Sequence, residues 1–242
     1  MKKLITSFMA LFFLIGIGTK SYGQAAGDYV FTQATDTLWA TVGNWSISDG
    51  AGNLSAATVT PTATTNVWIQ AGKRLVTVGA NTSVTSAIVA GSSTVTLSAA
   101  STTVAVGMAV KGTGIAQGSY VTAVNGTAVT LSQAATSSNA AISLAFYPAC
   151  KSLTVNGYFL TAAQLVVFGD ITVNAGGNLK QGSDLYCVNI NNYGIFNATT
   201  NYRSSKSLYV GFNGATPGTG DYSIVNNGTF GDSQANYACR SW

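Results

Sequence analysis

Between residues 153 and 230, short runs of alternating apolar and polar residues each end in the same kind of turn. The recurring phrase is a β-branched residue, an asparagine, and a glycine within three positions of that asparagine. The phrase contains the asparagines Asn156, Asn174, Asn191 and Asn226 and, beside or just before them, the apolar residues Val155, Val173, Ile190 and Ile224. The asparagines are 18, 17 and 35 residues apart. Because 35 is nearly two periods, a missing copy is expected near residues 208–212.

This pattern predicts turns of chain stacked on one another. One turn cannot bury its own apolar side, but turns stacked about 4.8 Å apart can bury it together. We predict an all-β fold, a short-coil parallel β-helix of about five coils, right-handed as crossover connections favour. The four apolar residues should point inward in register, and the four asparagines should form a ladder of side-chain amides. Residues two positions past each glycine should stack inside, namely Phe159, Leu179, Phe196 and Phe230.

Residues 84–147 follow a different pattern. The run at 94–98 is echoed 34 residues later at 128–132, and Asn125-Gly126 lies between two alternating runs, which is a strong hairpin signal. We predict a small antiparallel β-module inserted between the first and second coils. The expected division is a signal peptide (1–23), an N-terminal cap with the first coil (24–83), the module (84–147), further coils (148–232) and an irregular tail (233–242). The tail either ends a short natural chain or marks a fragment of a longer one.

Two further phrases carry a resemblance. Residues 38–45 read Leu-Trp-Ala-Thr-Val-Gly-Asn-Trp, and residues 150–155 read Cys-Lys-Ser-Leu-Thr-Val. With these, the chain resembles secreted Bacteroidetes-type surface proteins that are adhesin-like parallel β-helices. The phrase at 107–115 is similar to one in small β-modules of phage tail proteins and adhesins, where it is a structural repeat. We expect Trp39, Trp45 and Trp68 to close the open end of the first coil, with a sugar-stacking platform as the alternative.

Composition and the N-terminus favour an exported protein. Charged residues make up only 7%, and the chain has no His and no Glu. Lys2 and Lys3, an apolar run over 4–18 and small residues at 21–23 are typical of a secretory signal, which we expect to be cleaved before Gln24. An uncleaved anchor is the alternative, but about fifteen apolar residues are short for a membrane span. We therefore expect a secreted or cell-surface protein with no integral membrane segment after cleavage.

The mature chain would be almost neutral. Removing 1–23 takes three of the 11 basic residues away and leaves eight against seven Asp. With this near-neutral net charge, the chain lacks the excess positive charge that would attract nucleic acid or an anionic membrane. The odd number of cysteines (Cys150, Cys187 and Cys239) fits no metal site, and we expect buried thiols in preference to a disulfide. No cofactor is expected.

Catalysis by paired carboxylates also finds no support in the spacing. Asp170 and Asp221 are 51 residues apart, close to three coils, which places them about 14 Å apart on one face. Glycosidase carboxyls lie within about 10 Å of each other. A serine or cysteine nucleophile cannot be paired with His, because the chain has none. We therefore predict that the protein is not an enzyme.

Tyrosines are the better candidates for binding. Those in or beside the coils could stack on sugar rings, and a binding role would align them on one face, whereas ordinary strand tyrosines would be scattered. The six candidates are Tyr158, Tyr186, Tyr193, Tyr202, Tyr209 and Tyr222. The leading hypothesis is a non-catalytic structural or adhesin-like protein that contacts neutral glycan or a surface protein weakly. The alternatives are the N-terminal part of a larger polysaccharide lyase or hydrolase, and a self-associating surface or fibre subunit.

Overall fold

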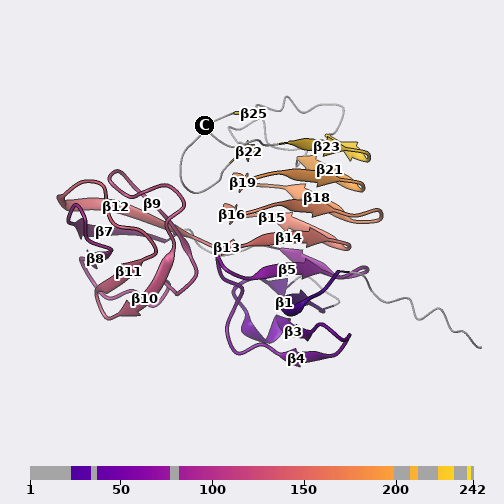
Figure 1. Ribbon diagram of the computed structural model, residues 1–242, viewed down its shortest axis with the longest axis horizontal. Helices are drawn as coiled ribbons and strands as arrows, with labels where there is room; N and C mark the ends of the chain where they lie inside the picture. Colours follow the sequence, from indigo (N-terminus) through magenta and orange to yellow (C-terminus); the bar gives the residue numbers. More distant parts are fainter. Residues whose placement is uncertain are drawn as a thin grey trace, which may run out of the picture.

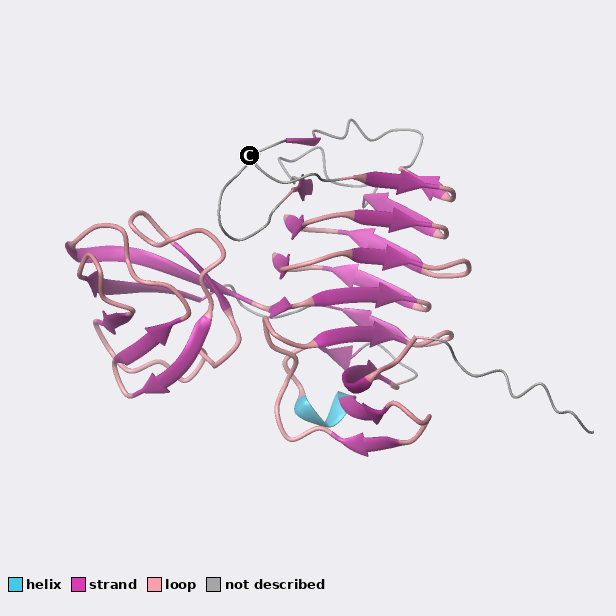
Figure 2. Ribbon diagram, in the orientation of Figure 1, coloured by secondary structure: helices cyan, strands magenta, loops and turns pink. Residues whose placement is uncertain are grey.

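The computed structural model describes residues 23–33, 37–76, 82–198, 208–211, 223–231 and 239–240. This part of the chain is all-β, with four sheets and one short 3-10 helix, η1 (Val42–Asn44). Figure 2 shows how little of the chain is helical. The expected signal peptide lies outside the described residues, apart from Gly23.

Three of the sheets consist mainly of parallel strands, and we call them together the stack. Sheet A has the order β23 (Ile224–Asn226), β20 (Ile190–Asn192), β17 (Ile171–Val173), β14 (Ser152–Val155), β5 (Asn66–Ile69), β1 (Ala26–Phe31), β3 (Trp45–Asp49) and β4 (Leu54–Ala56). Sheet B has β2 (Thr37–Leu38), β6 (Arg74–Val76), β15 (Tyr158–Thr161), β18 (Asn178–Gln181), β21 (Ile195–Ala198) and β24 (Thr229–Phe230). Sheet D has β13 (Ala149–Cys150), β16 (Leu165–Val167), β19 (Leu185–Cys187), β22 (Leu208–Val210) and β25 (Cys239–Arg240).

From β14 onward the chain passes through sheets A, B and D in a fixed order. The series β14, β15, β16 repeats as β17–β19, β20–β22 and β23–β25, and each strand pairs in parallel with its equivalent in the series before. Strands β5 and β6 pair with β14 and β15 in the same way, although 77–148 separates them in sequence. Figure 1 shows the equivalent strands lying above one another. One cluster of buried apolar residues extends through all three sheets.

The inward column of sheet B has the predicted register. Phe159 pairs with Leu179, Leu179 with Phe196, and Phe196 with Phe230. The rings of Phe196 and Phe230 are stacked, with centroids 4.8 Å apart and an angle of 6° between their planes. Aromatic side chains at the same position of successive turns therefore pack on each other.

The predicted register of sheet A is correct in two pairs, Val155 with Val173 and Ile190 with Ile224, and wrong between them. Val155 and Val173 are buried partners. Ile190 is buried, but it pairs with Ile171 and not with Val173. Ile224 lies opposite Ile190 yet is 40% exposed, because β23 is the last strand of sheet A.

The asparagine ladder has two separate parts. Asn174 Nδ2 donates to Asn156 Oδ1 at 2.7 Å. The next bond uses Asn192, whose Nδ2 donates to Asn226 Oδ1 at 2.8 Å. Asn191, the predicted member, instead lies opposite Thr172 and is half-buried. The apolar pairing of the preceding isoleucines fixes this register, and it places Asn192 opposite Val173, inside the stack.

The missing copy expected at 208–212 is also a wrong prediction. Leu208–Val210 belongs to sheet D and pairs with β19. Strand β23 pairs directly with β20, so the interval from Ile190 to Ile224 is one long turn of chain and not two turns. In sheet A, Leu153 and its partner Ile171 are 18 residues apart, and Ile171 and its partner Ile190 are 19 apart, so the spacing stays near the predicted period only where the connecting segments are short.

The glycines between sheets A and B are needed for close approach of neighbouring turns. A Cβ on Gly157 would collide with the carbonyl oxygens of Gln70 and Lys73, and one on Gly177 would collide with that of Val155. Gly194 and Gly228 meet backbone atoms in the same way. None of these four glycines has a φ in the left-handed region, so missing volume, and not backbone freedom, explains the glycine in each phrase.

The tryptophans at the first end of the stack are largely buried. Trp39 and Trp45 contact each other edge to face with ring centroids 5.1 Å apart, and Trp39 lies 6.1 Å from Phe159. Trp45 lies in β3, which with β4 adds an antiparallel hairpin to the edge of sheet A. Trp68 is half-buried and donates its indole N–H to Asp28. Trp39 and Trp45 thus close the end of the stack and form no exposed platform.

The fourth sheet, sheet C, is antiparallel and curled, and we call residues 82–147 the module. Its order is β10 (Val121–Asn125), β11 (Ala128–Leu131), β8 (Thr94–Leu97), β7 (Thr82–Ile88), β12 (Asn139–Tyr147) and β9 (Ala109–Lys111). The two echoed runs are neighbours, with Val129 opposite Val95. Asn125 pairs with Ala128 around Gly126, whose φ is +60°, as expected of the hairpin. The module has a core of its own and projects sideways from the stack (Figure 1).

Candidate functional site

Sheet D is buried on both faces. All three residues of β16 and all three of β19 are buried, so these strands show no alternation of exposure. Their inner residues face the core of the stack, and their outer residues form a second column that runs through Ala149, Val166, Tyr186 and Tyr209. The module covers this outer column: Ala109 and Tyr147 of the module belong to the same apolar cluster as Val166 and Tyr186. Two bodies with separate cores therefore meet at sheet D.

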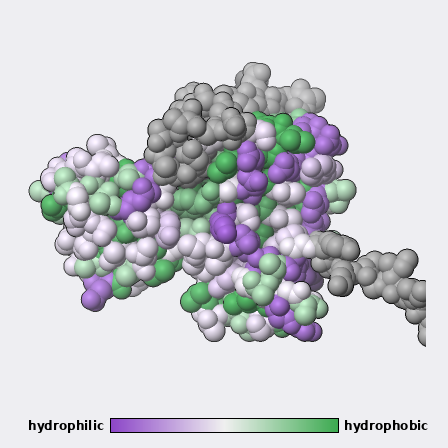
Figure 3. Space-filling model, in the orientation of Figure 1, coloured by the Kyte–Doolittle hydropathy of each residue, from purple (hydrophilic) through white to green (hydrophobic). Residues whose placement is uncertain are grey.

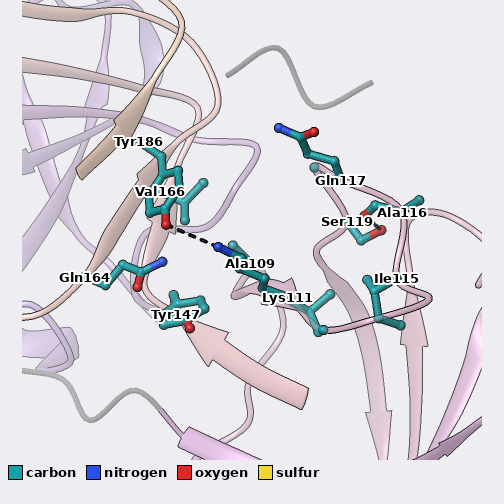
Figure 4. Close-up of a pocket in the computed structure, with 13 residues that line it drawn as sticks. Ala109, Lys111, Ile115, Ala116, Gln117, Ser119, Tyr147, Gln164, Val166 and Tyr186 are labelled. Carbon is teal, nitrogen blue, oxygen red and sulfur yellow. Dashed lines mark hydrogen bonds between the residues drawn. The ribbon is translucent and has the colours of Figure 1, made fainter. Parts of the chain in front are cut away.

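A cleft of about 180 Å³ lies at this junction. Tyr186, Val166 and Gln164 line it from the stack. The module contributes Tyr147 at the end of β12, Lys111 at the end of β9 and the loop 112–119, which includes Ile115 and Ser119. Figure 4 shows Tyr147 on the same side as Gln164 and Tyr186, the loop residues Ile115 and Ser119 on the other side, and Lys111 between them. Figure 3 shows that the visible surface of the module is mostly near-neutral in hydropathy.

Lys111 connects the two walls. Its Nζ donates to the Tyr186 hydroxyl at 3.4 Å and lies 5.4 Å from the centroid of the Tyr186 ring (Figure 4). Tyr186 also stacks on Tyr209, with centroids 4.4 Å apart. These contacts fix the phenol of Tyr186 at the edge of the cleft, although only 3% of the residue is exposed.

Both phenols of the cleft stay protonated at neutral pH. Burial raises the pKa of Tyr186 above its ordinary value, and Tyr209, Asp184 and Tyr147 raise it further. Burial, followed by the charge of Asp184, raises the pKa of Tyr147. A phenol whose pKa is raised remains neutral and can both donate and accept a hydrogen bond.

Gln164 is the most informative residue of the cleft. It is 8% exposed, it precedes β16, and its amide points into the cleft (Figure 4). No hydrogen bond of its side chain joins it to any other described residue. Buried amides are normally satisfied by the protein, by water or by a ligand. The nearby Gln181 follows the usual rule, because its Nε2 donates to the carbonyl oxygen of Ser183 at 3.1 Å.

The structure does not gather the six candidate tyrosines into one row. Tyr158 is on sheet B, where the Arg74 guanidinium lies 4.5 Å from its ring centroid. Tyr186 and Tyr209 are on the outer face of sheet D, and Tyr193, 45% exposed, lies in the turn after β20. Tyr202 and Tyr222 lie outside the described residues. Among the described candidates, only Tyr186 lines the cleft.

Sequence reasoning missed Lys111, Tyr147 and Gln164 as functional residues. A signal for the first existed: Lys111 is the only charged residue between Arg74 and Lys151. A signal for the covered face existed as well, in the uninterrupted apolar run at 165–168, because strands buried on both faces lose their alternation. No pattern in the sequence marks Gln164.

The other expected chemical groups lie apart from the cleft or outside the described residues. Cys150 and Cys187 are buried thiols in the core of the stack, as expected, and burial raises the pKa of Cys150. The described residues contain no cluster of three or more potential metal ligands. Asp170 accepts a hydrogen bond from Asn189 at 2.7 Å. Asp221 lies outside the described residues, so its predicted spacing of about 14 Å from Asp170 stays a prediction.

Comparisons of the chain with protein-family models, with curated proteins and with solved structures each found no match. In the part of the chain that the structure describes, no helix has the length and apolar character needed to cross a membrane. The case for a function therefore depends on the cleft itself.

Proposed function

We propose that the stack is a parallel β-helix and that the protein is an exported, non-catalytic, adhesin-like protein that binds a glycan in the cleft beside sheet D. The fixed order of sheets A, B and D and their in-register parallel pairing support the β-helix. The secretory character of the N-terminus supports export. In this scheme the β-helix is a rigid scaffold that carries the module at its side.

The observation that carries the binding function is the Gln164 amide. The buried side-chain atoms without a partner among the described residues are Asn178 Oδ1 and Asn192 Oδ1, so the Gln164 amide is within reach of water in the cleft and can bond to a ligand that replaces that water. Beside it are the Tyr186 hydroxyl and the Lys111 amine, with the apolar side chains of Val166 and Ile115 around them. Hydroxyl-rich ligands with apolar ring faces, which is to say sugars, match this mixture of donors, acceptors and apolar contacts.

A glycan array tests the site. The wild-type protein should bind a restricted set of glycans, and Gln164→Met should lose that binding without loss of thermal stability, because the amide has no partner among the described residues. Gln181→Met is the matched control: it should lower stability by removing the bond to Ser183 and leave glycan binding unchanged. Equal binding by wild type and Gln164→Met would exclude the cleft as the binding site.

The non-catalytic part of the proposal needs a separate assay. The glycans that bind should be incubated with the protein, and unsaturated and reducing-end products should be measured. No product is expected. Product formation that disappears in Asp170→Asn or Asp221→Asn would establish an enzyme and overturn this part of the proposal.

Export is tested by the N-terminus of the secreted protein. Sequencing should find Gln24, or Ala25 or Ala26 close by, as the first residue. Met1 at the N-terminus of the extracellular material would contradict a cleaved signal.

A further inference from the structure

Among the described residues that line the cleft, Lys111 is the only charged one. No Asp is among these lining residues, and the chain contains no Glu. Building on the glycan-binding function proposed above, we propose that the cleft takes the anionic group of an acidic sugar, a carboxylate or a sulfate, with Lys111 as its counter-ion. This ligand differs from the neutral glycan expected from the sequence, because the fold places the positive charge of Lys111 in the cleft.

The contact with Tyr186 holds the Lys111 amine in position without neutralising it. Lys111 Nζ donates to the Tyr186 hydroxyl at 3.4 Å and lies 5.4 Å from the centroid of the ring. Burial raises the pKa of Tyr186, so at neutral pH its hydroxyl is a neutral acceptor. An ammonium group can donate to more than one acceptor at once, and a hydrogen bond between charged groups is stronger than one between neutral groups. An anionic oxygen is therefore the best match for this amine.

Gln164 is an independent observation that points to a ligand at the same place. It is 8% exposed and lines the cleft from the stack, and its side chain has no hydrogen bond to another described residue. Figure 4 shows its amide on the side of the cleft where the Tyr186 hydroxyl and the Lys111 amine meet. An NH₂ donor beside an ammonium group suits a carboxylate or a sulfate, whose several oxygens accept hydrogen bonds from two donors together. The carbonyl oxygen of the same amide can accept from a neighbouring sugar hydroxyl.

The negative charge nearest in effect to the cleft is that of Asp184, which precedes β19. Its charge raises the pKa of Tyr147 and of Tyr186, so its field reaches both phenols. Asp184 does not line the cleft, however, whereas Lys111 does. Because the interaction between charges weakens with distance, the cation determines the sign of the charge that the cleft prefers. Asp184→Asn should therefore tighten the binding of an acidic sugar and leave that of a neutral sugar unchanged.

The test is calorimetric titration of the secreted protein with methyl glycosides. The acidic probes are those of glucuronic acid, galacturonic acid, glucose 6-sulfate and galactose 6-sulfate, and the neutral probes are those of glucose and galactose. At least one acidic probe should bind about tenfold or more tightly than its neutral counterpart, and added salt should reduce this preference. Lys111→Met should abolish the preference, and Lys111→Arg, which keeps the charge, should retain most of it. Lys180→Met is the matched control, because it removes the same charge from sheet B, away from the cleft, and should leave the preference in place.

The outcomes separate the two proposals. A preference for the uronates alone assigns a carboxylate, and one for the sulfated probes alone assigns a sulfate. Equal affinity for acidic and neutral counterparts, or a preference that survives Lys111→Met, would overturn the acidic assignment. If no simple glycoside binds, loss of acidic array glycans in Lys111→Met but not in Lys180→Met supports the assignment, and equal loss in both overturns it.

The array also tests the glycan-binding function by itself. Binding confined to neutral glycans and lost in Gln164→Met would leave that function intact and overturn the acidic ligand. Absence of array binding by the wild type would instead remove the glycan-binding function and the acidic ligand with it.

Discussion

In the stack, Phe159 lies between Leu75 of one neighbouring strand and Leu179 of the other, all three at the same position of successive turns. In the module, Val129 lies opposite Val95 in an antiparallel sheet that closes its core within residues 82–147. A core residue of the stack is thus part of a column that extends through every turn, whereas one of the module belongs to a small local cluster. The same chain therefore contains one region whose stability is shared along an axis and one whose stability is local.

Glycine shows the same contrast. In the stack, Gly177 is required because the carbonyl oxygen of Val155 leaves no room for a Cβ. In the module hairpin, Gly126 has open space around it and is favoured because its φ is +60°. Stacked turns thus select glycine by close contact between turns, and a hairpin selects it by backbone conformation.

The largest expected effect is on the apolar column. Phe159→Ala should lower the free energy of unfolding of the stack by about 3–5 kcal/mol, because a fully buried ring is removed between two turns. Tryptophan fluorescence during denaturation measures it, since Trp39, Trp45 and Trp68 are in the stack and residues 82–147 contain no tryptophan. Leu144→Ala in the module is the matched change and should leave the fluorescence midpoint in place. A single shared transition that shifts equally in both variants would contradict separate stabilities of the stack and the module.

The next effect concerns the turn glycines. Gly177→Ala should destabilise the stack by about 1–3 kcal/mol, since the added methyl group forces neighbouring turns apart. Gly176→Asn, one residue earlier, should cost much less, because its φ of +85° suits asparagine and nothing lies within 4 Å of the added atom. Thermal unfolding of the two variants measures the difference, and equal losses would contradict close contact as the reason why glycine recurs at this position in each turn.

A smaller effect, of opposite sign, is expected at Asn192. This residue occupies the inward position of Val173, and its Oδ1 is buried without a partner among the described residues. Its Nδ2 bonds Asn226 and the carbonyl oxygen of Thr229, both in exposed positions that water can reach. Asn192→Val should therefore stabilise the stack by about 1 kcal/mol. Chemical denaturation measures it, and a loss of stability would show that the asparagine pair contributes more than its buried oxygen costs.

The smallest effect appears only at high pH. The pKa of Tyr186 is raised by burial, so the folded protein holds this proton more tightly than the unfolded chain does. The resulting stability is complete below the ordinary tyrosine pKa of about 10 and is lost as pH rises above it. Tyr186→Phe should make the fall in melting temperature above about pH 10 shallower. An identical alkaline profile in both proteins would show that Tyr186 is not held neutral by the contact between stack and module.

The repeated strands could be predicted from the sequence pattern. The pairing of strands was predicted wrongly where the number of residues between repeats changes. The Phe159 column was correct because each of its residues stands two positions past a glycine that the turn requires. Asn191 was misplaced because strand register depends on apolar pairing between turns, which the distance to the nearest glycine does not determine. Ile224 has the predicted partner, Ile190, but is exposed because no further strand of sheet A covers it. The cleft could not be predicted, because it forms where residues from 109–119 meet residues from 147–186, and docking of the module on sheet D leaves no periodic signal.

The corner between sheets B and D has a consequence for how such a chain can change. Residues 162–164 and 182–184 make this connection in two turns, whereas residues 77–148, which contain the module, make it in the first. Going from a flexible loop of three residues to one of that length is between four and five doublings, worth roughly 3 kcal/mol of closure entropy. A folded insert whose ends lie close together costs less. Evolution or protein engineering can therefore replace the module inserted at this corner, and with it the ligand that is bound. The apolar columns of the stack stay the same.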